Sequence, residues 1–400
     1  MQIKLLLIFL FILGCSGETY DVSRAINILP EKTESFTPNP ALKNVSVTLN
    51  GNYYSGNLEK IKLVKLSSKF SNFELKEGSV CYVNKSFILR CFDLFSKNET
   101  AKIPLIISKT IKTKNINNIA LTVFENSAVA LTNDGYVIKA NIEEKLINWT
   151  AKIEDVTTIK PLILANKVYI FTSSGAVKIY DLETGDLLAQ SPKQEDQTGI
   201  NFSSTAKNLS PVPLQNNTII ASYYRNDILF FEAKTSIKIF QFSVNENSLD
   251  FNGITYNPIV LGGGMLVPSS SLLSFVSLSS GNKLWSLNAN IENGFGVIGN
   301  FIFFADRKAK KLVLASVQDA SVKWQSELEE NNLNKLFLVP ASSNELLMFN
   351  ENGIVTKFNL QNGEEIETVK ERFKSKNMDY KLQNGKIFYT ESNGTLIMLN

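Results

Sequence analysis

From about residue 75 onward, the chain alternates short apolar runs with polar turns. Runs rich in Val, Ile, Tyr and Phe, such as the one from Lys167 to Thr172, predict β-strands. Apolar residues spaced three and four positions apart, which would predict an amphipathic helix, are not sustained in this stretch. The pattern therefore predicts a body built of strands and turns.

These strands and turns recur as a repeat. Each unit centres on a strand, a tight polar turn and a second strand, and the turn returns about every 44 residues. Four short strands in a repeat of this length are typical of a β-propeller blade, so eight turns predict eight blades. The tips of the turns lie at Lys85, Gly135, Gly175, Asn226, Ser270, Lys308, Gly353 and Gly394.

A second turn follows each tip by about ten residues and often contains glycine, as at Gly185, Gly281 and Gly363. Each tryptophan of the chain lies four residues after this turn position, so all three share one place in the repeat. A large ring placed between neighbouring sheets buries much apolar surface. We therefore predict a packing role for the three tryptophans, Trp149, Trp285 and Trp324.

The last repeat lacks a fourth strand, because the run from Thr395 to Leu399 is followed only by Asn400. A strand without a repeat of its own, from Leu58 to Leu66, occurs near the beginning of the chain. We predict that it completes the last blade, since closing the ring removes exposed sheet edges. The predicted fold class is all-β: an eight-bladed β-propeller of four-stranded antiparallel blades, closed by an N-terminal strand.

The beginning of the chain indicates export. As a helix, the apolar run from Leu5 to Leu13 would be about 14 Å long, less than half of a bilayer core of about 30 Å, so it indicates a signal peptide. The run ends at Gly14-Cys15 and resembles a bacterial lipobox, which implies lipidation of Cys15. In that resemblance Ser16 implies the outer membrane. An ordinary secretory signal cleaved nearby is the alternative.

Three segments follow from this pattern. Residues 1–14 are predicted to be the lipoprotein signal peptide, and residues 15–50 a lipid anchor with a flexible tether, because they are rich in Ser, Thr, Pro and Asn. Residues 51–400 are predicted to form the propeller.

Composition removes several classes of function. The 400 residues include no histidine, so a Ser-His-Asp triad and imidazole metal ligands are excluded. Three cysteines cannot form a four-cysteine zinc site. A formal net charge of +3 is too small to indicate nucleic-acid binding. We expect a non-catalytic protein with no metal, no cofactor and no nucleic-acid partner.

Besides Cys15, the chain has two cysteines, Cys81 and Cys91, which lie on the two predicted strands of the first hairpin. With Lys85 to Phe87 as the tip, Cys81 opposes Cys91 across the strands. Directly opposed residues have Cβ atoms about 4.5–5.5 Å apart, somewhat long for a disulfide with about 3.8 Å between its Cβ atoms. An oxidising compartment would nevertheless favour the bond. Two small buried apolar side chains are the alternative. The run Gly262 to Gly264 lacks the Lys-Ser/Thr of a phosphate loop and is predicted to be a bend between strands.

The segments Asp181 to Leu188 and Ser280 to Trp285 resemble the pyrroloquinoline-quinone-type propeller repeat, in which a glycine turn leads into a strand bearing tryptophan. Together with the lipobox and the tether, eight such repeats resemble the BamB family of the outer-membrane β-barrel assembly machinery. That resemblance implies a scaffold on the periplasmic face of the outer membrane. It implies as partners a BamA-like subunit, other assembly lipoproteins, unfolded outer-membrane proteins and, through the anchor, the membrane.

Two other classes share this repeat. Quinoprotein dehydrogenases use a vicinal cysteine pair, whereas Cys81 and Cys91 are ten positions apart in this chain. A surface or periplasmic propeller that binds peptide or carbohydrate is the second alternative.

Two long segments lead into neighbouring repeats, from Gln194 to Ser210 and from Asn245 to Asn257. Loops on the end faces of a propeller are the parts available to a partner, and apolar side chains in polar loops are candidate anchors. The alternative is that the apolar side chains pack back into the blade. The candidate partner-binding residues are Ile200, Phe202, Ser204, Asp250 and Asn252.

Overall fold

The structure is a computed structural model, and all the residues that it describes belong to the second of two compact units, Met1–Asn39 and Pro40–Asn400. Among these residues no helix is long and apolar enough to cross a membrane. The described residues are 53–66, 70–76, 78–105, 119–132, 134–154, 159–194, 210–214, 217–224, 227–243, 254–291, 294–329, 336–369, 371–375 and 380–400.

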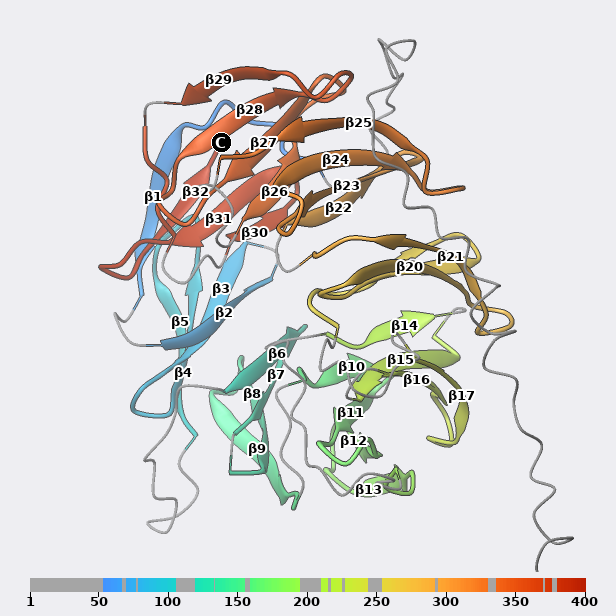
Figure 1. Cartoon of the computed structure of the whole chain (residues 1–400). Coiled ribbons are helices and arrows are strands. Elements are labelled where there is room, and N and C mark those ends of the chain that lie inside the picture. Colours follow the sequence, from blue (N-terminus) through green and yellow to red (C-terminus); the bar gives the residue numbers. More distant parts are fainter. Residues whose placement is uncertain are drawn as a thin grey trace, which may run out of the picture. The chain divides into compact units, whose positions relative to one another are not determined.

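The described strands form eight antiparallel sheets of four strands each (Figure 1). We number these sheets as blades 1 to 8 in chain order. Blade 1 contains β2 (Phe70–Lys76), β3 (Ser79–Asn84), β4 (Ile88–Asp93) and β5 (Glu99–Pro104). Blade 2 contains β6 (Ala120–Phe124), β7 (Ser127–Leu131), β8 (Tyr136–Asn141) and β9 (Leu146–Lys152). Blade 3 contains β10 (Leu162–Leu164), β11 (Lys167–Phe171), β12 (Val177–Asp181) and β13 (Leu187–Gln190). Blade 4 contains β14 (Val212–Leu214), β15 (Ile219–Tyr224), β16 (Asp227–Glu232) and β17 (Lys238–Ser243).

The second half of the unit continues the same order. Blade 5 contains β18 (Ile259–Leu261), β19 (Gly264–Pro268), β20 (Leu272–Ser277) and β21 (Lys283–Asn288). Blade 6 contains β22 (Phe295–Ile298), β23 (Phe301–Asp306), β24 (Lys311–Ser316) and β25 (Val322–Glu327). Blade 7 contains β26 (Phe337–Pro340), β27 (Glu345–Phe349), β28 (Val355–Asn359) and β29 (Glu365–Val369). Blade 8 contains β30 (Tyr380–Gln383), β31 (Lys386–Thr390), β32 (Thr395–Leu399) and β1 (Lys60–Lys65).

The eight-bladed fold predicted from the sequence is confirmed, and each predicted tip within the described residues lies between the second and third strands of its blade. The remaining tip, Asn226, lies outside the described residues. The glycine run is a bend as well, because Gly262 and Gly263 connect β18 to β19.

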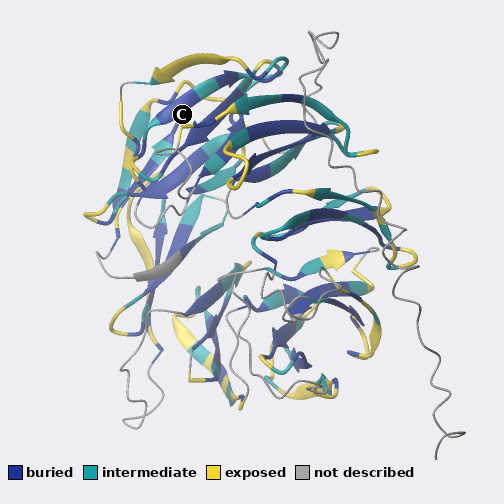
Figure 2. Cartoon of the chain, viewed as in Figure 1, coloured by how far each residue is buried: buried dark blue, intermediate teal, exposed yellow. Residues whose placement is uncertain are grey.

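Buried apolar side chains join each blade to the next around the whole circle. Separate clusters connect blade 1 to 2, 2 to 3, 3 to 4 and 5, 5 to 6, 6 to 7, 7 to 8, and 8 back to 1. First strands of neighbouring blades touch, as β2 touches β6 and β22 touches β26, so the first strands are innermost. Figure 2 shows exposed residues concentrated on the fourth strands and the turns, as on β13 and β29.

The tryptophans connect neighbouring blades, as predicted. Each ring lies on a fourth strand, and its Nε1 donates a hydrogen bond to a backbone carbonyl just after the third strand of the following blade. The three bonds are each 2.9 Å long and join Trp149 to Leu182, Trp285 to Val317, and Trp324 to Leu360.

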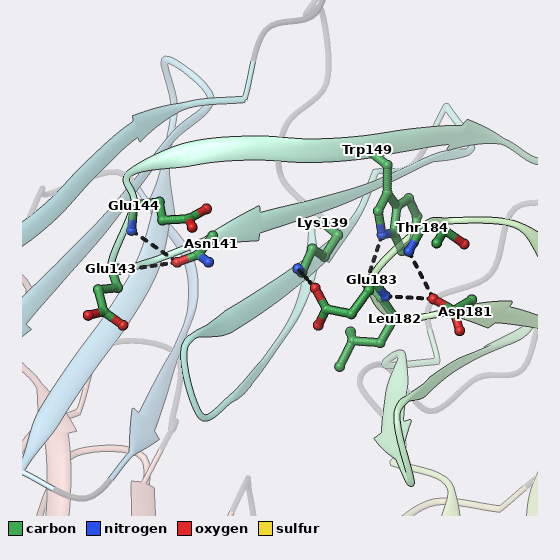
Figure 3. A network of polar contacts seen from close by, with 9 residues as sticks. All are labelled: Lys139, Asn141, Glu143, Glu144, Trp149, Asp181, Leu182, Glu183 and Thr184. Atoms are coloured by element: carbon green, nitrogen blue, oxygen red, sulfur yellow. Dashed lines mark hydrogen bonds and ion pairs between the residues drawn. The ribbon is translucent and has the colours of Figure 1, made fainter.

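The junction between blades 2 and 3 adds an ion pair to this bond (Figure 3). Lys139 lies directly across from Trp149 in the sheet, and its side chain is only 1% exposed. Its Nζ lies 3.3 Å from Oε2 of Glu183, in the turn that also carries the carbonyl accepting from Trp149. Asp181 holds that turn by accepting from the backbone N–H groups of Glu183 and Thr184 at 2.8 Å. The ammonium, the indole and the turn therefore fix the two blades together.

The turn between the third and fourth strands contains one residue with positive φ, always at the same place in the turn. The side chain of this residue lies against the fourth strand of the preceding blade, where an aromatic ring is often present. Gly185 has φ 77°, and a Cβ there would lie 2.6 Å from the ring of Trp149. In two junctions the preceding fourth strand has alanine instead of a ring, at Ala101 and Ala189. There the left-handed residue is larger, Lys145 with φ 58° and Ser236 with φ 60°. Where a ring packs on the turn, this residue is small: Gly185 faces Trp149, Gly281 faces Phe240 and Gly363 faces Trp324. In the turn whose Val317 carbonyl accepts from Trp285, it is Ala320, with φ 58°.

The predicted closure of the ring is present. β1 pairs antiparallel with β32, and Lys60 lies opposite Leu399. The backbone N–H groups of Asn57 and Glu59 donate to the carbonyl of Asn400 at 2.9 and 3.1 Å. Leu58, with φ 64°, takes the left-handed conformation that the corresponding turns of other blades also contain. The two ends of this blade therefore meet in the geometry of an ordinary turn, although the chain is not continuous there.

Cys81 and Cys91 are directly opposed on β3 and β4, in the register expected from the sequence. Their sulfurs are bonded, and their Cα atoms are 4.1 Å apart. Both residues are buried against blade 2, so the bond lies within the core between blades 1 and 2.

We predict that deletion of residues 16–50 leaves the melting temperature nearly unchanged, because a polar tether buries little surface. Deletion of residues 16–66 should lower it strongly, because β1 and the buried side chains of Tyr54, Val64 and Leu66 are removed. Thermal denaturation of the two truncated proteins checks this. Equal melting temperatures would show that β1 does not close the ring.

Glycine substitutions test the fit between turn and ring. Gly262 has φ 54° and open space around its missing Cβ, so Gly262→Ala should cost only the left-handed conformation, about 1–2 kcal/mol. Gly185→Ala should cost that amount and about 1–3 kcal/mol more, because the new methyl group overlaps the Trp149 ring. The comparison requires the free energy of unfolding of both variants. Equal losses of unfolding free energy in the two variants would mean that contact with the Trp149 ring does not disfavour a side chain at position 185.

Candidate functional site

The direction of the strands sorts the loops onto two ends of the propeller. Antiparallel neighbours reverse the chain, so the tips between second and third strands share one end with the connectors between blades. We call this the connector end. The turns between first and second strands and between third and fourth strands lie at the opposite end, which we call the turn end.

The candidate partner-binding residues fall in the two sequence segments that connect blade 3 to blade 4 and blade 4 to blade 5. Ile200, Phe202 and Ser204 fall within residues 195–209, and Asp250 and Asn252 within residues 244–253. Both segments, like the lipidation candidate Cys15, lie outside the described residues. The described residues on either side of each connector do define where it leaves and rejoins the propeller.

The first connector leaves the propeller at Gln194. Its backbone N–H donates to the carbonyl of Ser174, in the tip of blade 3, at 2.9 Å. Its side-chain Oε1 accepts from Nζ of Lys238 on β17 at 2.7 Å. The connector therefore begins held to both blades 3 and 4.

The two connectors rejoin the propeller at a shared point. The backbone N–H of Ser210, at the end of the first connector, donates to Oδ1 of Asn257, just beyond the second, at 2.8 Å. The hydroxyl of Tyr223 donates to the carbonyl of Ser210 at 3.0 Å. Burial raises the pKa of Tyr223, so this phenol stays neutral and remains a donor. Residues 47 positions apart in the sequence are thus held together where both connectors end.

The second connector ends on the tip of blade 5. Ile254 forms a β-bridge with Ser269, and the N–H of Thr255 donates to the carbonyl of Pro268 at 3.2 Å. Tyr256 follows, with 37% of its surface exposed and its ring edge-on to Phe295. The second connector therefore rejoins the propeller beside the tip of blade 5.

The turn end has a different surface, which the sequence reasoning did not identify. Of the exposed large apolar residues that the structure describes, all but Tyr53 and Tyr256 lie in or beside its turns. Leu188, Ile239 and Leu284 occupy the same place, the second residue of the fourth strand, in three successive blades. The full set is Phe95, Phe124, Leu146, Leu187, Leu188, Ile237, Ile239, Leu284 and Ile366, with exposures of 44% to 87%. The sequence could have indicated this surface, because Leu187 and Leu188 directly follow the turn of blade 3, and Ile237 and Ile239 directly follow that of blade 4.

The described residues contain no group of three or more His, Cys, Asp or Glu side chains placed to hold a metal ion. Their polar contacts at the connector end join backbone to backbone or fix loop ends. This geometry is suited to presenting loops to a partner.

The family model described as outer membrane protein assembly factor BamB matches residues 104–287. This segment covers blades 2 to 5, including the junction between Trp149 and Leu182 and both connectors. No curated protein matches the sequence.

Two solved structures place the fold among known propellers. The crystal structure of BamB from Moraxella catarrhalis matches with a TM-score of 0.64 and 14% identity, covering 88% of this chain and 99% of that one. The crystal structure of the computationally designed Ika8 protein matches with a TM-score of 0.60 and 12% identity, covering 84% of this chain and 99% of that one. By its sequence over residues 104–287 and by its propeller fold, the chain is therefore similar to BamB, the outer membrane protein assembly factor.

Proposed function

We propose that the protein is a non-catalytic scaffold lipoprotein of the outer-membrane β-barrel assembly machinery. It binds a BamA-like subunit, together with other assembly lipoproteins, and aids insertion of unfolded barrel proteins. The observation that carries this proposal is the match of residues 104–287 to the BamB model, since that segment contains both candidate connectors. In this proposal the propeller lies at the periplasmic face of the outer membrane, tethered through Cys15.

The disulfide agrees with an exported protein. Disulfides form and persist in oxidising compartments such as the periplasm and are rare in a reducing cytoplasm. Cys81 and Cys91 are bonded inside the first junction between blades, so the bond is part of the folded core.

An enzymatic function has less support. The quinoprotein relatives of this repeat use vicinal cysteines, whereas Cys81 and Cys91 face each other from separate strands. A propeller that binds peptide or carbohydrate would use the same kind of loops, so it differs in its partner and not in its fold. Identification of what co-purifies from detergent-solubilised membranes separates these two functions: a large barrel protein supports assembly, and saccharides or peptides alone support the surface binder.

The two connectors are proposed to form one binding patch, with Ile200 and Phe202 as apolar anchors and Ser204, Asp250 and Asn252 around them. The bond between Ser210 and Asn257 supports this arrangement, because it holds the two connector ends together. Their starting points on adjacent blades support it as well.

We predict that the double variant Ile200→Ala, Phe202→Ala loses partner binding while keeping its melting temperature. Truncation of a central anchor typically costs about 2 kcal/mol or more, roughly a thirtyfold loss of affinity. Pull-down of the barrel subunit and thermal denaturation of the same preparation measure both effects. Ile237→Ala, Ile239→Ala is the matched control, because it removes two exposed apolar side chains from the turn end.

Retained binding in the connector variant would contradict the patch, and loss in the Ile237 and Ile239 control would place the contact at the turn end. A strongly lowered melting temperature of the connector variant would mean that Ile200 and Phe202 pack into the blade. Replacement of a buried Phe by Ala costs about 3 kcal/mol or more of folding stability.

We predict that Cys15→Ala releases the protein from the membrane or leaves it unprocessed. Stable anchoring requires more than one acyl chain, which the lipidated cysteine would supply. Membrane fractionation and the intact mass of wild type and variant check this. A variant that stays with the outer membrane at the mass of the wild-type protein would exclude lipidation at Cys15.

A further inference from the structure

Three charged side chains from three blades meet at one carboxylate oxygen. Oε1 of Glu74, on β2, lies 2.6 Å from Nζ of Lys160 and 3.2 Å from Nζ of Lys381. Lys381 is on β30 of blade 8, and Lys160 lies two residues before β10 of blade 3. Nζ of Lys381 also donates to the carbonyl of Phe73 and lies 4.8 Å from the centre of the Phe73 ring.

This cluster faces the centre of the propeller. β2, β10 and β30 are the first strands of their blades, and Figure 1 shows them on the inner side of the ring. Lys160 of the segment before blade 3 thus reaches Glu74 of blade 1, and its neighbour Pro161 accepts at its carbonyl from Thr122 on β6 of blade 2 at 2.6 Å. We call the three residues Glu74, Lys160 and Lys381 the channel cluster.

The channel cluster carries more positive than negative charge. Burial alone would raise the pKa of Glu74, but Lys381 and Lys160 outweigh it and lower the pKa, so the carboxylate is ionised at neutral pH. Two ammonium groups then share one carboxylate. Among the described residues, neither lysine pairs with a second carboxylate.

The surroundings make this excess charge costly. The side chains of Lys160, Glu74 and Lys381 are 18%, 20% and 21% exposed. A charge withdrawn from water is stabilised by a counter-charge with hydrogen bonds, and its interactions are stronger than at a fully hydrated surface.

The donors needed to hold an anion are also present. An ammonium has three N–H donors. Lys160 donates one bond to Glu74, and Lys381 donates to Glu74 and Phe73, within the part of the chain that the structure describes. Donors on both lysines therefore remain for another acceptor.

We propose that the channel cluster binds an oxyanion, a phosphate or carboxylate group, that enters the centre of the propeller. The two ammonium groups donate charge-assisted hydrogen bonds to it, and the carboxylate of Glu74 competes with it for their charge. This site is separate from the connectors and does not depend on the proposed assembly function.

Calorimetric titration of the purified propeller with sodium phosphate, and separately with sodium acetate, at constant ionic strength tests the proposal. Saturable binding is expected with at least one of the two anions, and the anion that binds distinguishes a phosphate from a carboxylate ligand. Lys160→Met should weaken it at least tenfold, which corresponds to about 1.4 kcal/mol. Lys308→Met is the matched control, because it removes an equal charge from an exposed tip and should leave the affinity unchanged.

A second variant keeps the test independent of folding defects in the lysine variant. Glu74→Gln removes the competing carboxylate and should bind the same anion more tightly than wild type. Absence of saturable binding in the wild-type protein would overturn the proposal and leave the cluster as an internal ion pair. The same affinity in wild type and Glu74→Gln, or in wild type and a folded Lys160→Met, would also overturn it.

Discussion

A propeller blade can cover its two faces only with the blades on either side of it, so its core exists only in a closed ring. The buried clusters of this protein lie between sheets, and the circle includes the junction of blades 8 and 1. Every interaction that aligns one blade with the next therefore contributes to the stability of all of them. The indole bonds to backbone carbonyls are the most regular of these, because the same donor and acceptor positions recur in three junctions.

The repeat could be predicted from the sequence because each blade is made of local hairpins. The register that places Cys81 opposite Cys91 follows from a short tip, and the turn at Gly185 is visible from its residues alone. The closing strand could be predicted by counting strands, because the last repeat was one short. All these features depend on residues close together in the sequence or on the regularity of the period.

Contacts between distant segments could not be predicted in this way. Glu74 and Lys381 are 307 positions apart, and each is an ordinary charged residue in its own strand. The burial of Lys139 also depends on a neighbouring blade that the local pattern does not specify. For the proposed binding patch, the sequence predicted the connectors and their candidate anchors. The structure adds that the described residues where the two connectors end, Ser210 and Asn257, are joined by a hydrogen bond.

The closure of blade 8 has a consequence for the order of folding. β1 is the first of the described strands along the chain, and its partner β32 is the last. The hairpin bearing Cys81 and Cys91 can form and oxidise early, since its strands are ten positions apart. The ring cannot close until β32 has been made, and until then β1, a strand rich in Lys, Leu and Val, has no partner. A long-range pairing of this kind is slow, and the exposed edge of the unfinished sheet invites association with other chains. Pairing of β1 with β32 is therefore the last step by which the described strands can complete the ring.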